Sequence, residues 1–256
     1  MRPFDLLFPP HCTLCDRDIE PDTADRSKAS DASPPEYSPL DVSLCRECVL
    51  ELTPPSRFAC RRCGSTLQAP PERPWCPRCR GVKTRFTETI AFGEYDGLLR
   101  QAVLGMKRDA WGTTASAVAE LFLLRSRREF IELEPEAIIP VPMHWARRIV
   151  RGVNSPEVFA ESLGRSLKLP VLIGALRRTR WTKRQAKLPP AARLQNVENA
   201  FKASRPEDIR GRRILLVDDI LTTGATCNEA ARVLKKAGAT QVAVAVFAKA
   251  EPNKNK

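Results

Sequence analysis

The chain has 256 residues, a formal net charge of +12 and 43% hydrophobic residues. This length suits one domain of ordinary size with a smaller one beside it, and the hydrophobic fraction is sufficient for a packed core. No apolar run is long enough to span a bilayer, and the first ten residues, MRPFDLLFPP, carry an acid and prolines where a signal peptide needs a clean apolar stretch. These features exclude an integral membrane protein, and we expect a soluble, cytoplasmic one.

The first third of the chain contains four CxxC pairs: Cys12/Cys15, Cys45/Cys48, Cys60/Cys63 and Cys76/Cys79. Two-residue spacing lets both thiolates of a pair face one metal ion, and two pairs complete a tetrahedral site. Structural disulfides are disfavoured in a reducing cytoplasm, and a redox motif would need one pair rather than four. We therefore predict two structural zinc ions, although the sequence also allows the two quartets to be interleaved.

A 29-residue insert, residues 16–44, separates the two pairs of the first quartet. It is rich in Asp, Ser, Ala and Pro, a composition typical of disorder. His11 is a possible substitute ligand, but a surface histidine is the simpler interpretation, and Cys227 is expected to be a buried thiol. We predict a zinc-binding region over 1–86 with the disordered insert at about 16–44, a second domain over 87–250 and a disordered tail over 251–256.

Strands and helices are expected to alternate along the second domain. Strands are predicted over 89–95, 137–141, 171–176 and 242–248, and helices over 98–107, 113–130, 155–167 and 228–237. The basic stretch 177–190 is expected to be mobile. Such an alternation predicts an α/β fold with a parallel, doubly wound sheet, whose ligands bind beyond the carboxyl ends of the strands.

The segment RILLVDDILTTGAT, Arg213–Thr226, is the most informative part of the chain. It predicts a buried strand over 214–217, an acidic pair and a small-residue turn that opens a helix. The start of a helix binds phosphate well, Gly224 lets the backbone approach an anion, and neighbouring threonine hydroxyls add donors. Two carboxylates beside such a turn suit the hydroxyls of a ribose, so a phosphorylated sugar is the expected ligand. The alternative is an ordinary turn in which the Asp pair only caps the helix.

The positive charge is concentrated in one segment. Between Pro140 and Arg213 there are 17 Lys and Arg against five Asp and Glu, which accounts for the whole excess of 12. Such a segment attracts phosphates of a nucleotide or of nucleic acid, unless it is only a solvated face. Trp145 and Trp181 lie in it as possible stacking platforms for bases, with packing roles as the alternative.

The Arg213–Thr226 segment resembles the PRPP-binding motif of type I phosphoribosyltransferases. The order of motifs along the whole chain is similar to that of the ComF family, phosphoribosyltransferase-like proteins associated with natural competence. The residues that carry this resemblance are Pro140, Val141, Pro142, Arg151, Gly152, Asn154, Gln185, Leu188, Arg193, Asn196, Val197 and the loop 218–226. The chain departs from the family in having RGVNS where RGFNQ is usual, and in the long insert of the first quartet.

The resemblance implies a type I phosphoribosyltransferase fold with a small N-terminal double zinc-ribbon domain. It implies a pyrophosphate loop over 142–147, a flexible hood over 182–188, and Mg²⁺ bound together with PRPP. The implied catalytic residues are Asp218, Asp219 and Arg147. The implied ligand-binding residues are Asp218, Asp219, Thr222, Thr223, Gly224, Ala225, Thr226, Pro142, Met143, Arg147, Arg151 and Lys107.

Two functions follow from these features. The first is a protein of DNA uptake that binds PRPP or a related phosphosugar or nucleotide, handles single-stranded DNA and has a DNA-uptake helicase or channel protein as partner. Its nucleic-acid candidates are Arg148, Arg151, Arg177, Arg178, Arg180, Lys183 and Arg184. The second is an active phosphoribosyltransferase that transfers ribose 5-phosphate from PRPP to a base or an amine. The sequence leaves open the acceptor, the oligomeric state and whether turnover occurs.

Overall fold

The structure is a computed structural model that describes residues 11–19, 43–54, 58–70, 75–109, 111–144, 148–149, 153–182 and 188–251. Most of the predicted insert and nearly all of the predicted C-terminal tail lie outside these residues. The expected disorder of both segments therefore stays a prediction.

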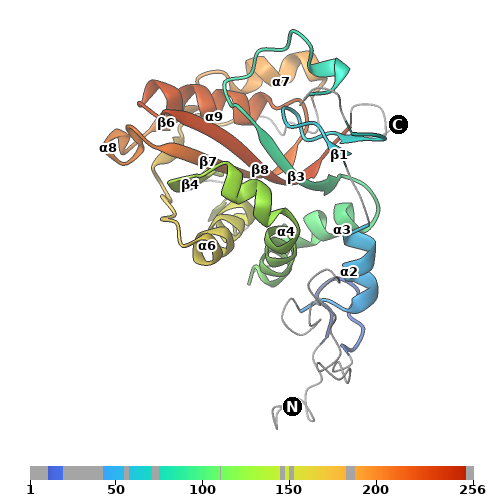
Figure 1. Cartoon of the computed structure of the whole chain (residues 1–256). Helices are drawn as coiled ribbons and strands as arrows, with labels where there is room; N and C mark the ends of the chain where they lie inside the picture. The colour runs from blue at the N-terminus through green and yellow to red at the C-terminus, as the bar shows by residue number, and fades with distance from the viewer. Residues whose placement is uncertain are drawn as a thin grey trace.

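A four-stranded parallel sheet forms the centre of the molecule (Figure 1). Its strands are ordered β3 (Thr89–Glu94), β8 (Gln241–Lys249), β7 (Arg213–Leu221) and β4 (Ala137–Pro140), and each neighbouring pair is parallel. The two central strands are almost wholly buried, because helices cover both faces of the sheet. This arrangement confirms the predicted fold class.

Helices form a layer on each face of the sheet (Figure 1). The helices α3 (Gly97–Met106), α4 (Thr113–Glu132) and α6 (Ser155–Leu167) cover one face, and α9 (Ala225–Lys236) with α7 (Pro190–Val197) covers the other. Phe122 of α4 lies 5.4 Å, between ring centroids, from Phe92 of β3, Phe130 of α4 and Phe159 of α6. This aromatic cluster packs the helical layer of α3, α4 and α6 against the sheet.

Most predicted elements are present with small changes in their ends, and the helix over 155–167 has the predicted bounds. The predicted strand over 171–176 is wrong. Val171 makes a single bridge to Ile138, and the chain then turns at Gly174, whose φ is +80°. Strand β5 (Leu176–Arg178) begins only after this turn and pairs antiparallel with β6 (Phe201–Ala203). The start of the stretch expected to be mobile is thus an ordered strand.

The acidic pair also differs from its expected place. Strand β7 continues past Asp218 and Asp219 to Leu221, because β8 pairs with it as far as Lys249. The carboxylates therefore lie inside the last part of the ladder and are held by it. A short helix, α8 (Pro206–Ile209), links β6 to β7.

The two Cys quartets lie on different parts of the sheet domain. Helix α2 (Arg46–Leu52) contacts α3, and Cys45, Cys48 and Leu52 join the core of the first helical layer. The hairpin of β1 (Phe58–Ala59) and β2 (Thr66–Leu67), with the 3-10 helix η3 (Pro77–Cys79), lies instead beside β3, where Thr89 N–H donates to Arg61 O at 2.7 Å. Figure 1 shows α2 below α3.

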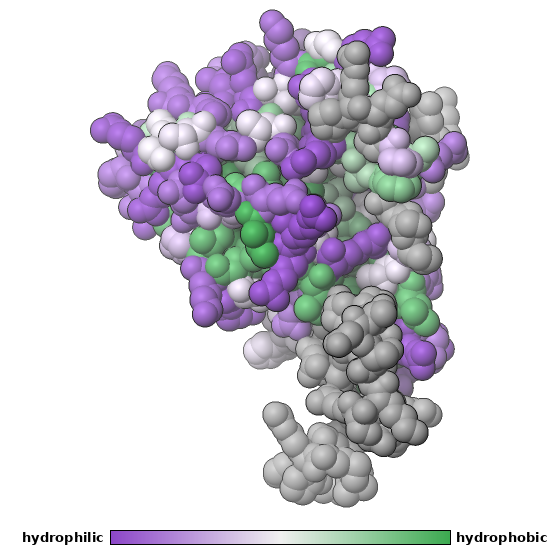
Figure 2. All heavy atoms as spheres, viewed as in Figure 1, coloured by the Kyte–Doolittle hydropathy of each residue, from purple (hydrophilic) through white to green (hydrophobic). Residues whose placement is uncertain are grey.

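Hydrophilic side chains cover most of the face shown in Figure 2, and hydrophobic ones gather over α4, where Leu124 and Ile131 are exposed. No helix in the described part of the chain combines the length and the apolar character that a membrane crossing needs.

Candidate functional site

The predicted phosphate loop is the turn between β7 and α9. Gly224 precedes the first residue of α9 and has a φ of +78°, in the left-handed region that favours glycine. A Cβ there would meet Leu221 and Phe86 only at ordinary contact distances of 3.8 Å. Glycine is thus needed for the backbone conformation, which turns the first N–H groups of α9 outward, and the turn has the shape of an anion site.

Asp218 and Asp219 have different surroundings although they are adjacent. Asp218 is only 9% exposed, accepts from the Asp219 N–H at 2.9 Å, and lies 3.8 Å from the Cys227 thiol, measured from Oδ2 to Sγ. Burial and the neighbouring Asp219 carboxylate raise the pKa of Asp218 to about 8, although the Asp219 N–H and the charge of Arg178 oppose this shift. Burial and the two carboxylates also raise the pKa of Cys227, so the predicted buried thiol is confirmed.

Lys107 is brought to the acidic pair from another part of the chain. It follows the last residue of α3, and its Nζ lies 3.1 Å from Asp219 Oδ2. The predicted ligand-binding residues Lys107, Asp218 and Asp219 therefore meet at one place, at the carboxyl end of β7. A cation and two carboxylates beside a helix start can bind both the hydroxyls and the phosphate of a sugar phosphate.

The segment after β4 reaches the same edge of the sheet. Val141 N–H donates to Val217 O at 2.8 Å, and Asp218 follows Val217 directly. The next residues along the chain, Pro142 and Met143, therefore begin at the level of the acidic pair. His144 is buried and its ring meets that of Trp181 edge-on, with centroids 5.0 Å apart. Trp181 thus has a packing contact as well as 55% exposure. The rest of the predicted pyrophosphate loop and most of the hood, with Arg147, Arg151, Trp145, Lys183 and Arg184, lie outside the described residues.

The described nucleic-acid candidates have different roles. Arg180 donates from Nη2 to Asn196 O and Glu198 O, at 3.0 and 2.7 Å, and so caps the end of α7. Arg148 pairs with Glu157 at 2.8 Å. Arg178 points inward, donating to the Thr182 hydroxyl at 2.7 Å and stacking over the Phe201 ring. Arg177 is exposed opposite the exposed Lys202 in the antiparallel pair of β5 and β6, so these two form a basic pair on the surface.

The cysteines form two separate clusters in chain order, which excludes interleaving of the quartets. Within each cluster all four sulfur atoms lie within 4.8 Å of one another, and the sulfur atoms of the pairs Cys15–Cys45, Cys63–Cys76 and Cys60–Cys79 are 3.6, 3.8 and 3.9 Å apart. A tetrahedron with Zn–S bonds of about 2.3 Å places its sulfur atoms ~3.8 Å apart. Both clusters could therefore hold zinc.

The cysteines of the second cluster differ in acidity. Burial opposes ionisation of Cys60, but N–H groups of Cys76, Cys63 and Arg62 lower the pKa of its thiol to about 7. Burial raises the pKa of Cys63 and of Cys79. His11 belongs to neither cluster, because its Nδ1 pairs with Asp18 at 2.9 Å and its side chain is half exposed.

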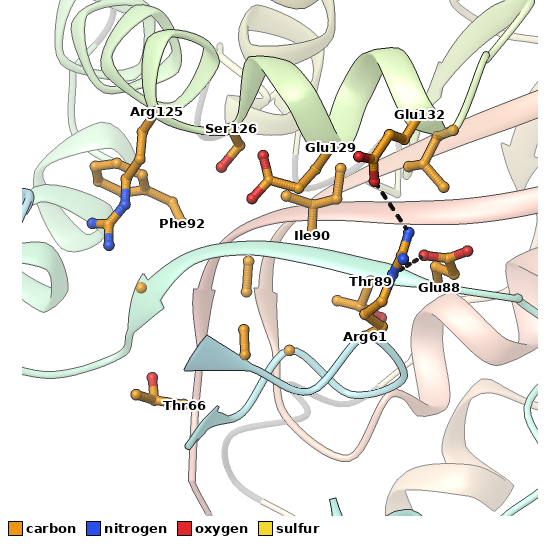
Figure 3. A pocket seen from close by; sticks show the side chains of 15 residues that line it. Arg61, Thr66, Glu88, Thr89, Ile90, Phe92, Arg125, Ser126, Glu129 and Glu132 are labelled. Atoms are coloured by element: carbon orange, nitrogen blue, oxygen red, sulfur yellow. Dashed lines mark hydrogen bonds and ion pairs between the residues drawn. The ribbon is translucent and has the colours of Figure 1, made fainter. Parts of the chain in front are cut away.

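A cavity of about 240 Å³ lies away from the acidic pair, between the β1–β2 hairpin, β3 and α4 (Figure 3). Glu129 and Ser126 of α4 and Phe92 of β3 line it, and Arg61 reaches across one end to Glu88 and Glu132 at 2.7 and 3.7 Å. None of the predicted site residues lines this cavity. The cavity lies where the β1–β2 hairpin, which carries part of the second Cys cluster, packs against the sheet domain.

Comparison with known proteins decides the family. A model of the phosphoribosyl transferase domain matches residues 157–256. Competence protein F of Haemophilus influenzae is 32% identical over 211 residues, which cover 81% of this chain and 90% of that protein. The chain belongs to the competence protein F family.

Other relatives agree with this assignment. The DNA utilization protein YhgH of Shigella flexneri is 33% identical over 207 residues, which cover 80% of this chain and 83% of that protein. A solved purine phosphoribosyltransferase from Pyrococcus horikoshii is 18% identical over 63% of this chain and 78% of its own, with a TM-score of 0.30. A TM-score this low adds nothing to the fold assignment, which follows from the parallel sheet and the family match.

Two residues at the site of this competence protein F family member were missed in the sequence. Lys249, 5% exposed, donates from Nζ to Thr222 O in the predicted phosphate loop at 3.0 Å. Phe86 packs behind Gly224. The signal for Lys249 was a charge at the end of an otherwise apolar strand, VAVAVFAK, whereas nothing local to Phe86 marks it. Arg178, assigned to nucleic acid, lies near enough to Asp218 to influence its pKa.

Proposed function

We propose that this protein binds PRPP or a related phosphosugar, with Mg²⁺, at the carboxyl ends of β4 and β7, and serves DNA utilization. The observation that carries the proposal is the meeting of Lys107, Asp218 and Asp219 beside the turn at Gly224. The names of the relatives, competence protein F and DNA utilization protein, support the biological role.

Each part of the site has a separate task in this proposal. Asp219, a quarter exposed, accepts hydrogen bonds from the ribose hydroxyls, while the N–H groups at the start of α9 and the hydroxyls of Thr222, Thr223 and Thr226 hold the 5′-phosphate. Mg²⁺ bridges diphosphate oxygens and draws on a carboxylate of the pair, since it prefers oxygen ligands. Arg147 and Arg151 pair with the diphosphate.

The test is calorimetry with PRPP and Mg²⁺ on the wild type and on the Asp218→Asn/Asp219→Asn variant. We expect the wild type to bind and the variant to lose binding, with both zinc ions retained in each protein. Undiminished binding by the variant would show that the acidic pair is not the site.

A second function, single-stranded DNA binding, is favoured by the exposed Arg177–Lys202 pair and by the basic segment around it. Arg148 and Arg180 remain candidates for DNA contact, because both are exposed although each also bonds within the protein. A DNA-uptake helicase or channel protein is proposed as partner, and a cytoplasmic location is proposed with it. Transfer of the phosphoribosyl group to a base or amine is the competing outcome, recognised by pyrophosphate release.

We propose that two zinc ions, one in each cluster of four cysteines, serve a structural role. All four cysteines of each cluster converge on one point, so a bound zinc ion would keep no open position for chemistry.

A further inference from the structure

The phosphate loop is held from behind by a buried lysine. Lys249 ends β8, and its Nζ donates to Thr222 O at 3.0 Å and to Ala250 O at 2.6 Å. Thr222 is the first residue after β7, where the loop leaves the sheet. Lys249 is only 5% exposed, and its ammonium group, aimed at this carbonyl, fixes where the loop begins.

Glu251, two residues after Lys249, forms a hydrogen bond with a residue of the second Cys cluster. Glu251 Oε2 accepts from Arg78 Nη1 at 2.6 Å, and Arg78 lies between Cys76 and Cys79. Burial alone would raise the pKa of Glu251, but the nearby Ser65 side chain, the hydrogen bond from Arg78 and the charge of Lys249 lower it. Glu251 is therefore an anion placed between a cation of the cluster and the cation under the loop.

Further contacts join the same two parts of the chain. The N–H of Arg85, just after the second cluster, donates to Asn228 Oδ1 of α9 at 2.7 Å. The next residue, Phe86, packs behind Gly224, and Ala250 N–H donates to Leu221 O at 2.9 Å. Residues at the start, middle and end of the phosphate loop are thus contacted by segments that follow the second cluster in the chain or are hydrogen-bonded to it.

We propose that Lys249 is a positioning residue for phosphosugar binding, and that Glu251 and Arg78 couple it to the second four-cysteine cluster. This inference rests on the proposed function of the loop. It assigns the second cluster a role in the sugar-phosphate site, because N–H groups bind an anion well only when the loop is already held in the binding conformation.

A competing explanation is that Lys249 acts only through its charge. The two explanations predict opposite results for Glu251→Gln. Removal of a negative charge near the loop would strengthen anion binding if charge alone mattered. Loss of the anion that bonds Arg78 and lies two residues from Lys249 would weaken binding if the positioning proposal is correct.

The experiment compares the full-length wild type with Glu251→Gln, Arg78→Gln, Lys249→Met and Lys249→Arg. Arg80→Gln is the matched control, because Arg80 follows the same cluster, is exposed, and makes no ion pair among the described residues. Calorimetry measures the affinity for ribose 5-phosphate and for PRPP, elemental analysis counts zinc, and hydrogen–deuterium exchange follows the amides of 222–226.

We expect Glu251→Gln and Arg78→Gln to weaken ribose 5-phosphate binding about tenfold and to speed exchange in 222–226, with two zinc ions retained. Lys249→Met should weaken binding further and Lys249→Arg should restore part of it, whereas the control should match the wild type. Equal or tighter binding by Glu251→Gln, with unchanged exchange, would overturn the proposal. Should the wild type bind no phosphosugar, the proposed function fails, and the exchange measurement alone decides whether the coupling exists.

Discussion

Lys107 Nζ lies 3.1 Å from Asp219 Oδ2, so the end of α3 reaches the carboxyl end of β7. The side chains are 25% and 24% exposed, which places the ion pair at the opening of the site rather than in its interior. Asp218 lies behind, buried against Cys227. The outer carboxylate therefore has a cation in contact, and the inner one is surrounded by protein.

Replacement of this cation tests its role in ligand binding. We expect Lys107→Met to weaken PRPP binding about tenfold, because the positive charge beside the carboxylate proposed to bind the ribose hydroxyls would also attract the phosphates. Arg108→Gln is the control, since Arg108 is the exposed neighbour and should leave affinity within about twofold. The affinity for PRPP is measured by calorimetry at low and moderate salt. Equal affinities of Lys107→Met and the wild type would contradict the proposed role of Lys107.

The raised pKa of Asp218 predicts how stability depends on pH. The group titrates at about 8 in the folded protein against an ordinary 3.8, so between these values the folded state binds more protons than the unfolded one. Stability from this group therefore falls as pH rises from about 4 to about 8. We expect Asp218→Asn to remove this fall and to stabilise the ligand-free protein at pH 8 by a few kcal/mol, since each tenfold difference in proton affinity between the two states is worth at most ~1.4 kcal/mol.

Urea unfolding of the wild type and Asp218→Asn at pH 5 and pH 8 measures this difference. The two proteins should be closest at the lower pH. A variant whose stability falls with pH as steeply as that of the wild type would show that Asp218 is ionised throughout.

The cysteine clusters predict the metal content. Wild-type protein should contain two zinc ions, and Cys60→Ser should contain one and lose folding free energy on the order of 10 kcal/mol in the region of the second cluster. Cys227→Ala is the control that should keep both ions, because Cys227 belongs to neither cluster. Elemental analysis and mass spectrometry under native conditions make the count. Two ions in Cys60→Ser would show that this cysteine is not a ligand.

The exposed basic pair predicts a salt-dependent interaction with single-stranded DNA. Arg177→Gln/Lys202→Gln should weaken binding and reduce the slope of log affinity against log salt by about one for each phosphate that the variant no longer neutralises. Arg128→Gln on α4 is the control, because its side chain is 89% exposed but lies outside the basic segment. Fluorescence anisotropy at several salt concentrations gives the slopes, and identical slopes for all three proteins would exclude the β5–β6 strand pair from the DNA surface.

Features that depend only on residues close to one another in the sequence could be predicted from the sequence. The CxxC spacing, the helix over 155–167 and the strand–turn–helix around Gly224 are local patterns, set by ligand geometry, hydrophobic periodicity and backbone conformation. The strand wrongly predicted over 171–176 shows the limit of such patterns. Its apolar residues suit a strand, but only Val171 finds a partner strand before the turn at Gly174.

The amino-acid sequence by itself determined that this is a parallel α/β protein with four CxxC pairs and a strand–turn–helix around Gly224. Only the tertiary structure decided which distant side chains meet there. It joined Lys107 to Asp219, and it joined Arg78 to Glu251 across 173 residues. The reason is physical, because these contacts depend on how the sheet and its helices bury their apolar faces, and no local spacing records that packing.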